Sequence, residues 1–107
     1  MPGKLESRIE RDAWTRARDL MGVTSSKIVT PGETGWPDRL FWLPTGHPVL
    51  IEFKRPGEAP RPKQEHVHAL LRDLGYPVYV CDSAIVALLI IRAGLIKRGI
   101  RCEWNGE

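Results

Sequence analysis

Cysteines and long apolar runs are both scarce in this sequence. Its 107 residues include two cysteines, Cys81 and Cys102. That is too few for a disulfide framework, so a reducing setting is expected. The longest apolar run, Ala84 to Ile91, is far shorter than the roughly 20 residues that a membrane-spanning helix needs. The N-terminus lacks the apolar stretch of a signal peptide. These absences favour a cytoplasmic protein that does not contact a membrane.

The net charge and the length of the chain restrict the class of protein further. Lys and Arg number 16 against 13 Asp and Glu, which gives a net charge of +3 and a pI near 9.1. A basic balance favours anionic partners such as nucleic acid, although +3 is a weak signal by itself. The length suits one domain, predicted over residues 1–107. Because so short a chain buries only a modest core, dimerisation is expected.

The apolar spacing predicts the element order αβββαβα, a small mixed sheet with helices packed on it. The fold class is therefore α/β, of the α+β mixed-sheet type, with a core over about residues 5–82 and a C-terminal helix. Turn chemistry at residues 31–35 and 44–47 separates the early strands. We expect helices over residues 5–21, 62–74 and 83–97, and strands over residues 23–30, 39–43, 48–54 and 77–81.

Two acids and a lysine are predicted to meet at one end of this sheet. Glu52 and Lys54 are two apart on a strand, so they project from the same face. The short turn before this strand makes an antiparallel hairpin that brings Asp38 close. A four-residue turn sets Asp38 opposite Phe53, and a slip of one residue sets it opposite Glu52. A Glu-x-Lys triplet alone is usually a surface ion pair. The presence of Asp38 across the hairpin favours a functional site instead.

Two carboxylates this close repel each other unless a cation lies between them. Oxygen ligands favour Mg²⁺ or Mn²⁺. A lysine beside such a cation can steady a phosphate or the attacking water. The sequence therefore predicts a phosphodiester-cleaving site built on Asp38, Glu52 and Lys54.

Further polar residues are candidates for the same site. Gln64 lies on the helix face that packs on the sheet, where it must find a polar partner or face a site. In the first helix, Glu6 lies near the centre of the apolar stripe and is preferred as a third acid, and Glu10, one turn on, is its rival. His68, one turn after Gln64, is expected at the surface, with a place at the edge of the active site as the alternative. The buried stripe of the helix over residues 62–74 is expected to hold Val67, Leu70, Leu71 and Leu74.

Candidate DNA contacts flank the predicted site. Lys27, Arg39 and Arg55 are the basic residues closest to it along the predicted sheet. Trp36, in the loop before Asp38, is the tryptophan best placed to stack on a base.

Gly35-x-Pro37-Asp38, Glu52-x-Lys54 and the downstream Gln64 together resemble the PD-(D/E)xK nuclease superfamily. The closer likeness is to the virus-type replication-repair nuclease (VRR-NUC) domain, in its stand-alone phage and bacterial form. The resemblance extends from about Glu6 to Asp82, and it includes Lys27 and the segment from Gly75 to Val78.

The resemblance implies a restriction-endonuclease-like core and a set of residue roles. Asp38 and Glu52 would be metal ligands for Mg²⁺ or Mn²⁺, with the Phe53 backbone carbonyl completing the shell. Lys54 would be the catalytic lysine, Gln64 a supporting residue, and Glu6 or Glu10 an outer ligand. The likeness also implies a bacterial or phage-encoded homodimer that cuts branched DNA such as Holliday junctions. The alternative is a DNA-binding module of the same fold that does not cut.

Overall fold

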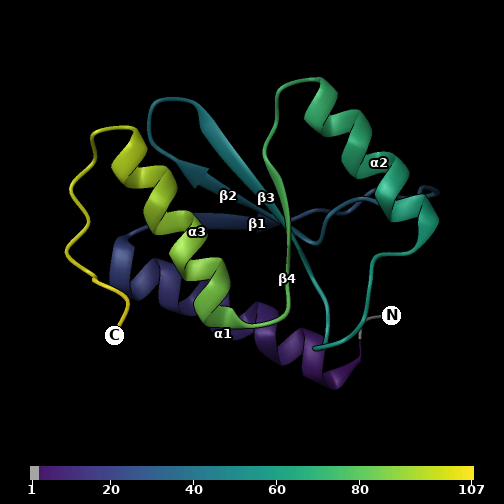
Figure 1. Ribbon diagram of the computed structural model, residues 1–107, viewed down its shortest axis with the longest axis horizontal. Helices are drawn as coiled ribbons and strands as arrows, with labels where there is room; N and C mark the ends of the chain where they lie inside the picture. Colours follow the sequence, from purple (N-terminus) through teal and green to yellow (C-terminus); the bar gives the residue numbers. More distant parts are fainter. Residues whose placement is uncertain (1–2) are drawn as a thin grey trace.

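A computed structural model describes residues 3–107 as a four-stranded sheet with helices against both faces (Figure 1). The order αβββαβα agrees with the prediction. Within residues 3–107, no helix is both long and apolar enough to cross a membrane. The elements are α1 (Lys4–Met21), β1 (Thr24–Lys27), β2 (Arg39–Leu43), β3 (His47–Phe53), α2 (Pro62–Asp73), β4 (Val78–Cys81) and α3 (Ala84–Lys97).

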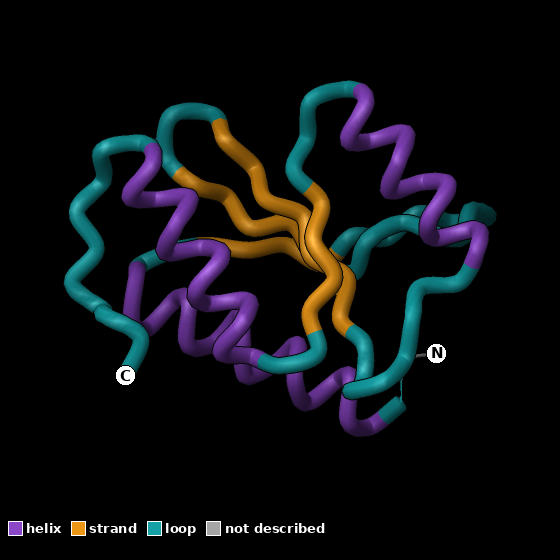
Figure 2. The backbone as a smooth tube through the Cα atoms, in the orientation of Figure 1, coloured by secondary structure: helices purple, strands orange, loops and turns teal. Residues whose placement is uncertain are grey.

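The sheet has the spatial order β1-β2-β3-β4 and is mixed in direction. The first three strands pair antiparallel, and β4 pairs parallel to β3. A parallel neighbour needs a crossover connection, and α2 supplies it (Figure 2). The ends of β2 and β3 that lie away from their hairpin turn therefore lie near the beginning of α2.

The β2–β3 hairpin has the register of the one-residue slip. Leu43 lies opposite His47 and Arg39 opposite Ile51, so the next pair beyond the ladder is Asp38 with Glu52. The turn over residues 44–46 uses left-handed backbone at Thr45 and Gly46. The alternative register, with Asp38 opposite Phe53, is not the one observed.

The two faces of β3 are buried against different helices. Val49, Ile51 and Phe53 enter the main core with residues of α1 and α3. Leu50 packs instead with Val67 and Leu71 of α2. This alternation is what the strand period of two predicts, and it places Glu52 and Lys54 on the α2 side.

The expected buried stripe of α2 was wrong in part. Leu70 and Leu74 are 50% and 67% exposed, whereas His68, expected at the surface, is 1% exposed. Gln64 and His68 both face Glu52, and Val67 and Leu71 share that side of the helix. The polar contacts thus set a helix rotation that the leucine spacing alone did not reveal.

The loop before β2 touches the beginning of α2 at Gly35. Gly35 has a φ of +91°, and a Cβ atom there would lie 2.7 Å from the backbone oxygen of Lys63. Only glycine tolerates both the left-handed backbone and this approach. The contact fixes the loop that carries Asp38 against α2.

Gly35→Ala should therefore destabilise the protein by about 2–4 kcal/mol, from about 1 kcal/mol of backbone strain plus the clash with α2. Gly32→Ala is the matched control, because Gly32 has a φ of +77° but open space around it. Gly32→Ala should lower the free energy of unfolding only by the backbone strain. Urea unfolding of both variants measures the difference, and equal costs would show that the contact with Lys63 constrains nothing.

Candidate active site

A polar cavity of about 280 Å³ opens at the end of β3, between the N-terminal ends of α1 and α2. Acidic and basic side chains line it together, unlike the apolar core on the other face of the strand. The lining residues are Gly3, Glu6, Asp38, Glu52, Phe53, Lys54, Arg55, Glu58, Arg61 and Gln64. Most of the site residues predicted from the sequence are thus brought to one place.

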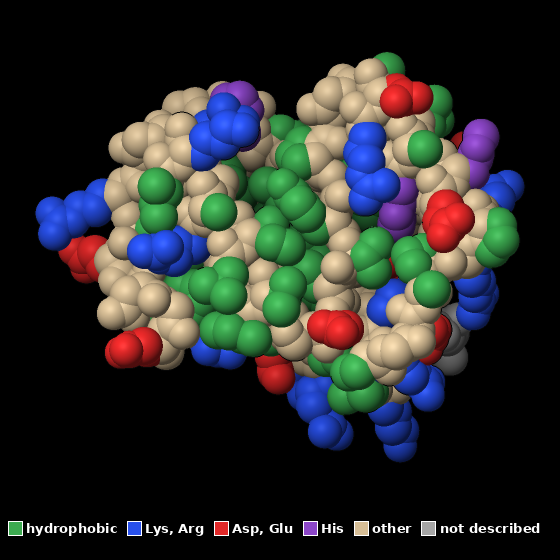
Figure 3. Space-filling model, viewed as in Figure 1, with side chains coloured by type: hydrophobic (Ala, Val, Ile, Leu, Met, Phe, Trp, Pro, Cys, Tyr) green, Lys and Arg blue, Asp and Glu red, His purple; other side chains and the backbone are tan. Residues whose placement is uncertain are grey.

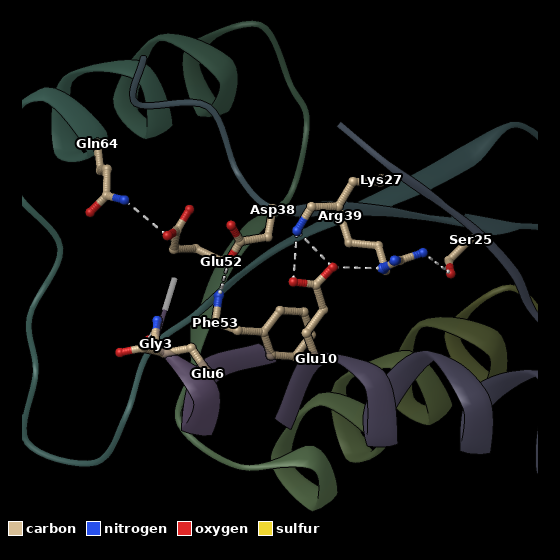
Figure 4. A network of polar contacts seen from close by, with 10 residues as sticks. All are labelled: Gly3, Glu6, Glu10, Ser25, Lys27, Asp38, Arg39, Glu52, Phe53 and Gln64. Carbon is tan, nitrogen blue, oxygen red and sulfur yellow. Dashed lines mark hydrogen bonds and ion pairs between the residues drawn. The ribbon is translucent and has the colours of Figure 1, made fainter. Parts of the chain in front are cut away.

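Asp38 and Glu52 enter the cavity from neighbouring strands (Figure 4). Asp38 directly precedes β2, and its Oδ2 accepts a 2.7 Å hydrogen bond from the Phe53 backbone N–H. Glu52 is the second-last residue of β3, and its Oε2 accepts a 2.9 Å hydrogen bond from Gln64. Each carboxylate is therefore oriented by a contact from another element.

The two acids are held in a strained electrostatic state. Burial raises the pKa of Glu52 to about 7, and the nearby Asp38 charge adds to the rise. Burial also raises the pKa of Asp38, against the opposing effect of the Phe53 N–H. In addition, Oε1 of Glu52 is buried and has no hydrogen-bond partner. A cation between the carboxylates would favour the charged form of both acids and give the unpartnered oxygen a ligand.

Lys54 supplies positive charge at the edge of this pair. Its side chain is almost fully buried, and its Nζ lies 3.7 Å from Oε2 of Glu52. Its backbone N–H donates to the carbonyl of Cys81 at 2.9 Å, which extends the pairing of β3 with β4. The sheet therefore fixes the backbone from which the lysine reaches into the cavity.

Gln64 links Glu52 to the beginning of α2. Its Nε2 donates to Oε2 of Glu52, while its Oε1 accepts a 2.8 Å hydrogen bond from the backbone N–H of Arg61. The second contact satisfies one of the free N–H groups at the helix N-terminus. Both ends of the amide are thus occupied, and the side chain holds Glu52 and the helix together.

The structure separates the two glutamates of α1. Glu6 lines the cavity, where Arg55 Nε donates to it at 3.2 Å and the Gly3 N–H also donates to it. The bond from Arg55 is the main reason that its pKa lies below the usual value. Glu10 lies outside the cavity lining and is held by Lys27 at 2.8 Å and Arg39 at 3.0 Å. Of the two, Glu6 is placed to serve the site.

The predicted DNA contacts have different surroundings. Arg39 is the least accessible: its side chain is 14% exposed, donates to Glu10 and Ser25, and lies over the Trp14 ring. Trp36 packs against the apolar cluster under α2. These placements do not support phosphate contact by Arg39 or stacking by Trp36. Arg55, 56% exposed, lines the cavity, whereas Lys27, 44% exposed, lies outside the lining and pairs with Glu10.

A divalent cation could be held by two side chains and one backbone group. Over residues 3–107, no three His, Cys, Asp or Glu side chains are arranged to hold a metal ion. The available oxygen donors are therefore Asp38, Glu52 and a main-chain carbonyl. The N–H and C=O of a strand residue point the same way within a sheet, so the Phe53 carbonyl lies on the side where its N–H meets Asp38. Glu6 lines the same cavity but does not form a three-carboxylate cluster with Asp38 and Glu52.

One residue that was expected at the surface, with the edge of the active site as the alternative, lies beside Glu52. His68 Nε2 lies 3.8 Å from Oε1 of Glu52, and the ring is buried, not at the surface as expected. A signal was present in the sequence, because His68 follows Gln64 by one helical turn and so shares its face.

A hairpin that carries two acids and a lysine, followed by a crossover helix with a glutamine, defines a nuclease of the PD-(D/E)xK class. The family model for the VRR-NUC domain matches residues 14–85. A protein named "Putative nuclease p44", from Acyrthosiphon pisum secondary endosymbiont phage 1, is 44% identical over 78 residues, which are 73% of this chain and 83% of that protein. A solved structure described as "VRR_NUC domain" is 29% identical, with a TM-score of 0.71, and the match covers 89% of this chain and 97% of the other.

The chain belongs to the VRR-NUC family of nucleases. The matched segment contains Asp38, Glu52, Lys54 and Gln64 but begins after Glu6 and Glu10. The assignment of an outer acid on α1 therefore rests on the geometry of the cavity alone.

The raised pKa of Glu52 predicts a pH-dependent stability of the metal-free protein. Its carboxyl group is protonated up to pH 7 when folded, but only up to its ordinary value of 4.5 when unfolded. Folding therefore binds a proton in this window, so stability falls as pH rises from 4.5 to 7 and then levels off, by up to about 3 kcal/mol.

Glu52→Gln should abolish most of this loss and make the metal-free protein more stable than the wild type at pH 8. Urea unfolding in a chelator at pH 5 and pH 8 measures it. Glu103→Gln, which alters an exposed carboxylate, should retain the wild-type pH dependence. An unchanged pH dependence in Glu52→Gln would show that Glu52 ionises normally.

Proposed function

We propose that this nuclease is a metal-dependent DNA endonuclease that hydrolyses phosphodiester bonds, with a preference for branched DNA such as Holliday junctions. One observation carries the proposal: the partly buried Asp38 and the buried Glu52 lie side by side next to Lys54, both have raised pKa values, and one oxygen of Glu52 has no partner. Such an arrangement lowers stability unless a cation and an anionic substrate complete it.

The donor set fits Mg²⁺ or Mn²⁺. Asp38, Glu52 and the Phe53 carbonyl offer oxygen ligands only, which these hard cations prefer. When bound, the cation would polarise the scissile phosphate and make the attacking water more acidic. A Mg²⁺ ion usually retains several waters, and Glu6 is positioned to accept hydrogen bonds from them.

Other residues of the protein have separate roles in the proposed reaction. Lys54 can orient the attacking water or neutralise negative charge that builds on the phosphate in the transition state. Gln64 holds Glu52 in its ligand orientation through Oε2. Arg55 lines the cavity and Lys27 lies near enough for its charge to act on Asp38, so these two partly exposed side chains offer contacts to the phosphate backbone.

Branched-DNA selectivity and a homodimer are proposed from the family resemblance, and the surface offers support for the dimer. Apolar side chains gather in the hollow between α2 and α3, over the edge strand β4 (Figure 3). Tyr79, Ile85 and Leu89 are among the exposed large apolar residues. A second copy of the chain could cover them and present two active sites to two of the four strands of a Holliday junction.

The test is cleavage of a labelled four-way junction, a flap and a linear duplex in Mg²⁺ and in Mn²⁺. Asp38→Asn should lower the cleavage rate at least about a thousandfold, which corresponds to about 4 kcal/mol of transition-state stabilisation, while binding is retained. Asp73→Asn, at the exposed end of α2, is the matched control and should cut at the native rate.

Native-rate cleavage by Asp38→Asn would refute the metal assignment. Tight junction binding without cleavage in either metal would favour the alternative, a DNA-binding module of the same fold. Cleavage of all three substrates at equal rates would refute the selectivity and leave the nuclease intact.

The two acids of α1 should behave differently when neutralised. Glu6→Gln should lower cleavage about 10- to 100-fold with little loss of stability, because it removes a hydrogen-bonding partner of the metal site. Glu10→Gln should instead cost about 1–2 kcal/mol of stability, because Lys27 and Arg39 lose their shared partner. Cleavage rates and urea unfolding of both variants separate these effects. The reverse pattern would make Glu10 the functional acid.

A further inference from the structure

Two buried polar atoms without hydrogen-bond partners face each other behind the active site. They are Oε1 of Glu52 and Nε2 of His68, which lie 3.8 Å apart, and they are the only such side-chain atoms among the described residues. This separation is too long for a hydrogen bond. A buried polar group without a hydrogen bond lowers stability, so the placement of these two atoms opposite each other requires a reason.

The position of His68 on α2 supplies a geometric reason. Gln64, one helical turn earlier, donates to Oε2 of Glu52, and His68 lies against the other oxygen, Oε1. Residues four apart on a helix lie on the same face, so α2 presents one nitrogen to each carboxylate oxygen. Glu52 is thus flanked on both oxygens by a single helix.

We propose that His68 is a positioning residue for Glu52: with its Nε2–H directed at Oε1, it holds the carboxylate in the orientation that metal binding requires. The proposal deepens the proposed nuclease function and rests on it for its effect on metal binding and cleavage. A shift of less than 1 Å would close the contact into a hydrogen bond.

Packing alone does not account for a histidine here. Its helix neighbours in the same buried layer, Val67 and Leu71, are apolar, and an apolar side chain would fill the site without burying a polar ring. A neutral imidazole carries one N–H, which can lie on Nε2. A neutral donor leaves the charge of the carboxylate available to a cation.

The arrangement makes α2 the element that aligns both acids. Its first turn touches Gly35 in the loop that carries Asp38, and its inner face holds Glu52 through Gln64 and His68. Movement of this helix would therefore change the two carboxylates together, which fits a site whose donors come from separate segments.

Three variants test the proposal. His68→Leu removes the donor at similar volume. His68→Gln keeps an N–H donor at a similar reach. Val67→Ala is the matched control, because it disturbs packing under α2 without touching Glu52.

Calorimetric titration with Mn²⁺ gives the first readout. His68→Leu should weaken Mn²⁺ binding about tenfold or more, the usual effect of removing a residue that orients a metal ligand. His68→Gln should stay within about threefold of the wild type, and Val67→Ala should bind like the wild type even though it is less stable. In cleavage of junction DNA, His68→Leu should lower kcat and leave KM unchanged.

A metal-free readout keeps the proposal independent of the nuclease assignment. In a chelator, the change in the unfolding constant caused by His68→Leu is compared in the wild type and in Glu52→Gln. A positioning contact predicts that the two changes differ at least about fivefold. If the wild type binds no Mn²⁺ and does not cut, the proposed function fails, and this comparison still decides the role of His68.

The proposal is overturned if the two changes in the unfolding constant are equal. It is also overturned if His68→Leu binds Mn²⁺ as the wild type does, or if His68→Gln loses affinity as severely as His68→Leu. In each of these cases His68 would be a packing residue only.

Discussion

The pairing register of β2 and β3 determines whether this protein has an active site. With Arg39 opposite Ile51, the ladder leads to Asp38 beside Glu52 at the open end of the hairpin. If β3 slipped by one residue, its side chains would exchange faces: Glu52 would point into the core and Ile51 toward the cavity. The apolar residues that alternate with the acids therefore fix the site as firmly as they fix the sheet.

In this register, the buried Glu52 and the partly buried Asp38 lie side by side, which disfavours their charged forms. Residues of neighbouring elements offset part of this free-energy cost. Each carboxylate receives a hydrogen bond from another element, Asp38 from the Phe53 N–H and Glu52 from Gln64. The positive charge of Lys54 partly offsets the burial of Glu52, whose pKa still rises to about 7. The raised pKa of Glu52 supports the proposed cation site, because it costs stability that a purely structural cluster would have no reason to lose.

The first helix shows how the same residue type can serve two purposes one turn apart. Glu10 is neutralised by Lys27 and Arg39 and ties α1 to β1 and β2. Glu6 lies at the cavity and shares its partner Arg55 with Glu58. Because Arg55 is half exposed, its pairing with Glu6 contributes little to stability.

The sequence by itself determined the order of elements, the hairpin and the meeting of Asp38, Glu52 and Lys54. These depend on local periodicity and on a short turn, which act within a few residues of one another. It also indicated that Gln64 faces the sheet. The family match over residues 14–85 then covered Asp38, Glu52, Lys54 and Gln64.

Only the tertiary structure decided the register, the separate roles of Glu6 and Glu10, the enclosure of Arg39 and the burial of His68. Each of these depends on how a helix is rotated or which charge lies across from it, and such contacts join residues far apart in the chain. A helical stripe read from leucines alone pointed to Leu70 and Leu74, which are exposed. In the structure, Gln64 and His68 face Glu52 instead, and Val67 and Leu71 are the buried apolar residues beside them.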